Sequence, residues 1–147
     1  MEEPISGPYL QTAVFCEQVL EEKTGTISLI RIIDRIQVTT PPGSFGQIVP
    51  PPVTPIAVIA LKSGSARGSH QLTIRQEAPN GMKQAAVVLT VLFEGEDRGV
   101  NVILPVPVGT DVEGLHWFEV LLDDQLLTKM PLRIVHQRIG FGFPAPQ

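Results

Sequence analysis

Proline and glycine divide this sequence into short apolar runs, and that punctuation constrains the fold more than any other feature. The 147 residues include 14 prolines and 13 glycines, which gather between the apolar runs. Both residues suit turns and interrupt regular hydrogen bonding, so the pattern is typical of strands separated by turns. The strongest strand signal is the isoleucine-rich stretch 26–39, because β-branched side chains suit a pleated surface.

Turn signals recur along the whole chain, and no segment predicts a secure helix. The sequence therefore predicts an all-β fold, an antiparallel β-sandwich of about eight strands that is immunoglobulin-like in general character. We expect a turn at residues 78–81 and loops at residues 63–69 and 94–98. The expected strands are 9–21, 26–39, 56–62, 70–77, 83–93, 99–108, 115–122 and 126–135.

The length predicts a single domain, which we place at residues 9–137. An N-terminal arm of residues 1–8 precedes it, and a C-terminal tail of residues 138–147 follows it. The Pro-rich loop 40–55 is expected to be an extended connection, because proline cannot donate a backbone hydrogen bond.

Residues 111–130 are compatible with either a helix or a hairpin. Thr110 begins a capping-box pattern, which favours a helix. Gly114 would fall within the first turn of that helix, and the apolar residues from Phe118 to Leu122 recur at every second position. We therefore expect a hairpin.

Charge and hydropathy disfavour several function classes. The chain carries 11 Lys and Arg against 15 Asp and Glu, a net charge of −4, so nothing favours binding to nucleic acid or to an anionic membrane. Residues 36–61 are uncharged but contain six prolines together with several polar residues, so they cannot form a membrane helix. The first residues lack the basic start of a secretory signal. We expect a cytoplasmic protein without a cofactor. Binding of a small-molecule ligand is not favoured.

The reactive side chains are few and scattered. Cys16 is the only cysteine, so it has no disulfide partner within the chain, and we expect it to be buried and inert. The histidines, His70, His116 and His136, lie far apart and show no zinc-ligand spacing. A hydrolase would need Cys16 or a serine of the segment 63–69 within hydrogen-bond reach of a histidine. We therefore predict no enzyme and no metal.

One end of the predicted fold collects acidic residues. Every second loop of an antiparallel arrangement lies at the same end, so four turns, near residues 22–25, 63–69, 94–98 and 123–125, should meet there. This makes a calcium- or carbohydrate-binding module the alternative function, since calcium prefers several oxygen ligands. Solvated turn charges, partly neutralised by nearby Lys and Arg, explain the same residues without a ligand. The candidate ligands are Glu94, Glu96, Asp97, Asp123 and Asp124.

The favoured function is a non-catalytic protein-binding or assembly module. In a strand, Trp117 and Phe118 point to opposite faces, which assigns Phe118 to the core and Trp117 to the surface or an interface. His116 beside it, together with Phe141 and Phe143 of the tail, completes the candidate interaction surface. The expected partner is a protein. A second copy of the chain, joined through an edge strand, is one candidate, because sheet edges must be covered.

The segment 13–42, AVFCEQVLEEKTGTISLIRIIDRIQVTTPP, resembles a bacterial family of small β-sandwich proteins that is catalogued as a domain of unknown function. The matching motifs are FCE at residues 15–17, the glycine at 25 and SLI at residues 28–30. At Arg31 the family pattern leads us to expect a glycine. The similarity covers most of residues 9–135 and implies a small β-sandwich, without a known activity or known catalytic residues.

Overall fold

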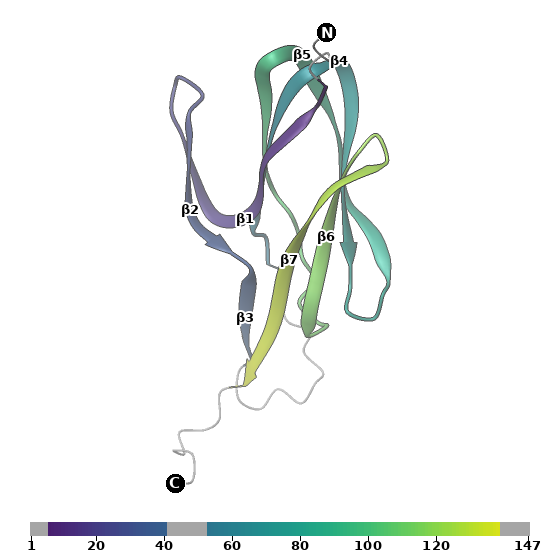
Figure 1. The fold of residues 1–147 in the computed structure, drawn as a ribbon. Helices are drawn as coiled ribbons and strands as arrows, with labels where there is room; N and C mark the ends of the chain where they lie inside the picture. The colour runs from purple at the N-terminus through teal and green to yellow at the C-terminus, as the bar shows by residue number, and fades with distance from the viewer. Residues whose placement is uncertain (1–5, 41–52, 139–147) are drawn as a thin grey trace.

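A computed structural model describes residues 6–40 and 53–138, and every regular element in these ranges is a strand. The prediction of an all-β fold is therefore confirmed. No helix of the described ranges has the length and apolar character needed to cross a membrane. The strands are β1 (Tyr9–Glu21), β2 (Ile27–Ile33), β3 (Arg35–Thr40), β4 (Ile56–Glu77), β5 (Lys83–Pro105), β6 (Gly114–Leu122) and β7 (Gln125–Arg138) (Figure 1).

β4 and β5 are two long strands where the sequence predicts four short ones. They pair antiparallel along their whole lengths, from Ile56 opposite Pro105 to Glu77 opposite Lys83. The predicted loops 63–69 and 94–98 are wrong, because these segments lie opposite each other within the ladder. Shifts in register let the pair bend there without breaking. Small residues and glycines thus mark bulges at this bend, which Figure 1 shows at the upper end of β4 and β5.

The strand predicted at residues 26–39 is divided at Asp34 into β2 and β3. β2 pairs with β1, whereas β3 leaves that hairpin and runs parallel to β7, with Arg35 opposite Arg133. A purely antiparallel arrangement is therefore wrong, and the sheet is mixed. Its strand order is β2-β1-β4-β6-β7-β3, and β5 pairs with β4 outside this path.

The long β4 joins two halves of this sheet. Its residues 56–62 pair with β1 and with the C-terminal half of β5, while residues 72–77 pair with β6 and with the N-terminal half of β5. Side chains of both halves meet in one core cluster. At its centre the rings of Phe15 from β1 and Phe118 from β6 lie edge to face, with their centroids 4.9 Å apart. Burial of this apolar surface is the main force that holds the two halves together.

Two local predictions hold in the structure. Residues 111–130 contain the β6–β7 hairpin, so the hairpin prediction is confirmed. Its turn residues Asp123 and Asp124 have φ values of +48° and +66°, which is the conformation of a two-residue hairpin turn. The turn at residues 78–81 also forms, and there the amide of Gly81 donates to the carbonyl oxygen of Ala78 at 2.8 Å.

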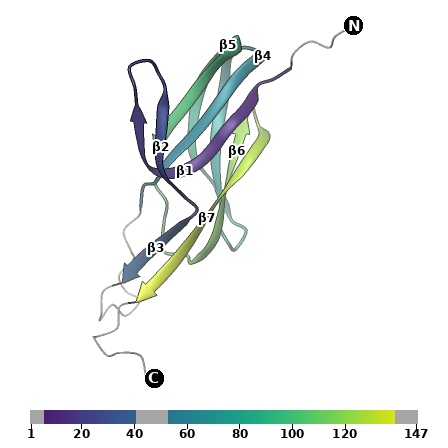
Figure 2. The same ribbon diagram turned by 60° about the vertical axis from the view of Figure 1, so that its left-hand side comes forward.

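The β1–β2 hairpin extends away from the rest of the sheet (Figure 2). Beyond Cys16, β1 pairs with β2 alone. Arg31 in β2 has a φ of +55°, the left-handed region that glycine enters without strain. The one position at which the family pattern leads us to expect a glycine is thus a position where the backbone favours one.

Several predicted segments fall wholly or mainly outside the described residues. These are residues 41–52 of the Pro-rich loop 40–55, residues 1–5 of the arm and residues 139–147 of the tail. The domain limits at 9–137 stay predictions.

Candidate interaction surface

Strand register gathers exposed aliphatic side chains on one face of the sheet. In one row Val88 lies opposite Thr73, Thr73 opposite Leu121, and Leu121 opposite Leu126. Residues directly opposite each other share a face, so this row crosses β5, β4, β6 and β7 on the side away from the core. Val88 and Leu126 at the two ends of the row are 53% and 50% exposed, whereas Leu121 between them is only 7% exposed. We call this side of the four strands the outer face.

Two strand positions further along, the outer face carries a charged row. The Nε of Arg75 donates to Oε1 of Glu119 at 2.9 Å, and Nζ of Lys83 lies 3.5 Å from the same oxygen. The Glu119 side chain is almost fully buried beneath these two cations. The hydrogen bond from Arg75 and the surrounding positive charges lower the pKa of Glu119. The carboxylate therefore stays ionised and holds both cations on the outer face.

Trp117 follows the charged row on the same face, where it lies opposite Pro131 of β7. Its side chain is 37% exposed, whereas Phe118 is fully buried. The predicted alternation of Trp117 and Phe118 is thus confirmed. Trp117 adds a large aromatic side chain to the aliphatic and charged rows of the outer face.

His116 does not share this surface. It is only 2% exposed and points to the same side of β6 as Phe118. Its Nε2 donates to the carbonyl oxygen of Val112 at 2.8 Å, and its Nδ1 accepts from Nε2 of Gln76 at 2.9 Å. A strand alternates with a period of two, so placing Phe118 in the core already requires His116 to lie there too. Phe141 and Phe143 lie outside the described residues, so their contribution stays a prediction.

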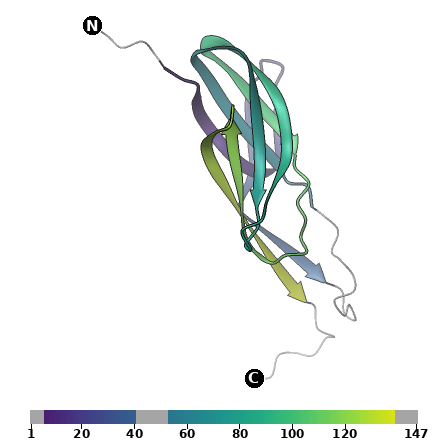
Figure 3. The same cartoon turned by 90° about the vertical axis from the view of Figure 1, so that its right-hand side faces the viewer.

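The outer face ends at an edge of the sheet. Among the described strands, β5 pairs only with β4, so its other side has no strand partner. Figure 3 views the side of the molecule on which the β4–β5 and β6–β7 pairs lie. Near this edge Leu92 is 57% exposed, while its neighbours Val91 and Phe93 are buried in the core. Residues 85–89 and 91–93 are apolar at consecutive positions, so apolar spacing does not tell which of these side chains is exposed.

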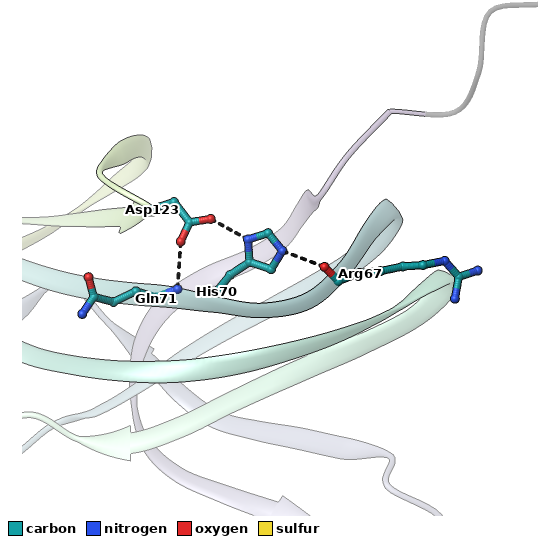
Figure 4. A network of polar contacts seen from close by, with 4 residues as sticks. All are labelled: Arg67, His70, Gln71 and Asp123. Carbon is teal, nitrogen blue, oxygen red and sulfur yellow. Dashed lines mark hydrogen bonds and ion pairs between the residues drawn. The ribbon is translucent and has the colours of Figure 1, made fainter.

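A polar network lies at the end of the fold where the acidic turns were expected to meet (Figure 4). Nδ1 of His70 donates to Oδ2 of Asp123 at 2.5 Å, and the Gln71 amide donates to Oδ1 at 2.9 Å. Nε2 of His70 donates to the carbonyl oxygen of Arg67 at 3.2 Å. Because each ring nitrogen of His70 faces an oxygen acceptor, these two hydrogen bonds favour the doubly protonated imidazole ring. The hydrogen bond to Asp123 raises the pKa of His70, and the Gln71 amide followed by His70 lowers the pKa of Asp123.

The remaining acidic candidates do not join this network. Oε2 of Glu94 accepts from Nη1 of Arg98 at 2.7 Å, which holds that carboxylate beside a cation. Glu96 and Asp97 line an open cavity with Tyr9 and Lys62. In residues 6–40 and 53–138, no three His, Cys, Asp or Glu side chains come together in a group that could hold a metal ion. Among the described residues, the five acidic candidates, Asp124 included, therefore do not form one metal-holding group.

The candidate nucleophiles are engaged elsewhere. Cys16 is fully buried, as predicted, and its Sγ lies 3.6 Å from the carbonyl oxygen of Gln18. Burial raises the pKa of this thiol, which keeps it protonated. Ser63 is also buried, and its Oγ donates to the carbonyl oxygen of Arg98 at 2.7 Å. In the part of the chain that the structure describes, neither side chain forms a hydrogen bond with a histidine.

A cavity of about 280 Å³ lies beside the β4–β5 turn and includes Gln76, Lys83, Asp111 and His116 in its wall. Both ring nitrogens of His116 are already hydrogen bonded to protein groups. The cavity thus has two charged residues in its wall but no free imidazole nitrogen from His116.

These observations define an all-β domain built on one mixed sheet, with an aliphatic outer face that ends at an open strand edge. The chain belongs to a family of unknown function (DUF6941), whose model matches residues 11–135. The resemblance found in the sequence is thereby confirmed. No curated protein matches this chain.

Proposed function

We propose that the protein is a non-catalytic protein-binding or assembly module that uses the outer face. The observation that carries this proposal is the gathering of Val88, Leu92 and Leu126 on one face, each with half or more of its side chain in water. Single exposed aliphatic residues are ordinary on protein surfaces, but several on one face favour a site of protein contact.

The outer face also has the polar content of a protein interface. Trp117 supplies an aromatic side chain of the kind that dominates binding energy at such surfaces. The Arg75–Glu119 pair offers charged groups whose positions are already held, so less side-chain freedom is lost on binding.

The proposed architecture is a β-sandwich of immunoglobulin-like general character, in which the two halves of the sheet pack face to face. The contact between Phe15 and Phe118 supports it, since these rings belong to strands of different halves. The long strands β4 and β5 would then pass from one layer to the other at their bend. The outer face is the water-exposed side of one layer.

Photo-crosslinking tests the proposed function. A photoreactive amino acid is placed at Val88 or Leu92 on the outer face, and at the exposed Thr24 in the β1–β2 turn as the control. In cells that make the protein naturally, we expect covalent protein adducts from the two outer-face positions and few from Thr24. A folded protein that forms no protein adduct from either outer-face position refutes the proposal.

Calcium or carbohydrate binding at the turn end is the alternative. Thermal melting with calcium, and again with EDTA, separates the two functions, because a ligand that binds only the folded chain raises the midpoint. We expect the same midpoint in both solutions. A higher midpoint with calcium would favour the alternative. We further propose a cytoplasmic location and a protein as the partner, in place of nucleic acid or a membrane.

A further inference from the structure

We propose that the partner is a second copy of this chain, paired antiparallel along the open edge of β5 about a two-fold axis at Thr90. This inference rests on the proposed function, since it names the partner that binds where the outer face meets the β5 edge. Beyond the proposed function, we specify which strand makes the contact, in which register it pairs, and with which symmetry.

The first argument is the chemistry of the open edge. Residues 85–93, AAVVLTVLF, contain no charge, no proline and no glycine. Exposed strand edges normally carry lysine, proline or a bulge, which prevent pairing with another chain. The ladder with β4 has one register shift in this segment, between Val87 and Ala85, so residues 87–93 have neither lysine, proline nor bulge. No described strand pairs with their outer side. A strand edge of this composition is suited to being covered.

The second argument is the register. A two-fold axis through Thr90 places Val88 of each copy opposite Leu92 of the other copy, so the two most exposed aliphatic side chains of β5 cover each other twice. Moving the axis to Leu89 sets Val88 opposite Thr90, and moving it to Val91 sets Val88 opposite Glu94. Among these neighbouring registers, only the axis at Thr90 makes both contacts aliphatic.

The third argument is charge. Within residues 83–97 of β5 the only cation is Lys83 at the start, while Glu94, Glu96 and Asp97 lie at the bend. Antiparallel pairing about Thr90 brings Lys83 of each copy toward Glu96 and Asp97 of the other. These opposite charges meet at both ends of the contact. The central segment brings no like charges together because it is uncharged.

Crosslinking at the axis tests the register. Thr90→Cys places the two new thiols across the axis from each other, so a short bismaleimide should join two chains. Native Cys16 is fully buried and does not compete for the reagent. Leu20→Cys is the matched control. Leu20 is also exposed to water, but it lies in the β1–β2 hairpin, which does not pair with β5, and it is not part of the outer face.

We expect Thr90→Cys to form at least about tenfold more covalent dimer than Leu20→Cys under the same conditions, since only Thr90 lies on the axis. A yield no higher than that of the control overturns the proposal.

Sedimentation equilibrium of the full chain gives a second test. We expect a concentration-dependent dimer for the unsubstituted protein. Val88→Lys should raise the dimer dissociation constant by at least about tenfold, because each change introduces a charge at both symmetric contacts. Leu20→Lys, in the β1–β2 hairpin, should leave the constant unchanged. Both side chains are half exposed, so lysine fits at either position without unfolding the domain.

Two results overturn the inference: a chain that stays monomeric at every concentration, or a dimer that the two lysine variants weaken equally. Photo-adducts to a different protein, combined with a strictly monomeric chain, would reject the β5 dimer and leave the proposed function intact. Absence of both adducts and dimer rejects the two together.

Discussion

The contact between Phe15 and Phe118 offers a direct test of how the two halves of the sheet pack. Both rings are buried, and they meet edge to face at an interplanar angle of 81°. Replacing either residue with leucine keeps an apolar side chain but removes the aromatic pair. We expect each single change to cost about 1–3 kcal/mol, less than the ~3–5 kcal/mol for truncating a buried phenylalanine to alanine.

The informative quantity is the coupling between the two changes. Aromatic pairs of this geometry contribute about 0.5–1.5 kcal/mol beyond the burial of each ring. The double variant should therefore lose about that much less stability than the sum of the two single variants. The two residues are on β1 and β6, which do not pair with each other, so coupling reports contact between the halves.

Urea denaturation of the single and double variants, followed by far-ultraviolet circular dichroism and by Trp117 fluorescence, measures the four free energies of unfolding at one protein concentration. Phe93 is the matched control, because it is a buried phenylalanine whose ring contact is with His70. Pairing Phe15→Leu with Phe93→Leu should be additive to within about 0.5 kcal/mol. A Phe15–Phe118 coupling no larger than this control would refute the reasoning and with it the proposed sandwich packing.

Three further predictions concern polar groups. The raised pKa of His70 and the lowered pKa of Asp123 mean that their pair stabilises the fold between two limits. Its contribution falls as pH rises through the raised His70 value and as pH falls through the lowered Asp123 value. Asp123→Asn should move the His70 pKa back toward 6.5 in an NMR titration, and an unchanged value contradicts this. The pKa of Glu119 is lowered in the folded chain, so its ionised carboxylate stabilises the fold at pH values above the ordinary pKa of a glutamate. This stabilisation is lost as pH falls through the lowered value. Arg75→Met should therefore reduce the acid dependence of the melting temperature, and an unchanged pH profile would argue against the pairing. Gln76→Leu leaves Nδ1 of buried His116 without its donor, so we expect a loss of about 1–3 kcal/mol in urea denaturation. An unaltered urea midpoint would show that the hydrogen bond from Gln76 to His116 adds nothing to the stability of the fold.

The local sequence pattern was sufficient to predict those structural features that depend on residues close together in the chain. The all-β class, the turn at residues 78–81 and the hairpin of β6 and β7 all follow from proline, glycine and apolar spacing over a few positions. The opposite orientations of Trp117 and Phe118 follow from the two-residue period of a strand. The same period also determines the interior position of His116, so that residue could have been placed from the sequence.

Other features depended on partners far away in the chain. Glycines at residues 64 and 95 are compatible with loops or bulges, and only the mutual pairing of β4 and β5 makes them part of one bent ladder. β3 finds β7 about a hundred positions later, and nothing in residues 35–40 encodes whether that pairing is parallel. Register between distant strands depends on which apolar surfaces can be buried together, and this is a property of the whole fold.

Some properties of the outer face follow from the sequence, and others depend on the tertiary structure. The sequence alone determined that residues 85–93 form an uncharged apolar strand and that Trp117 and Phe118 face opposite ways. Tertiary structure decided that Val88 and Leu92 lie in water while Val91 and Phe93 lie in the core. A strand that is apolar on both sides can present either side to the core, so only the strands packed against it decide which side chains stay exposed.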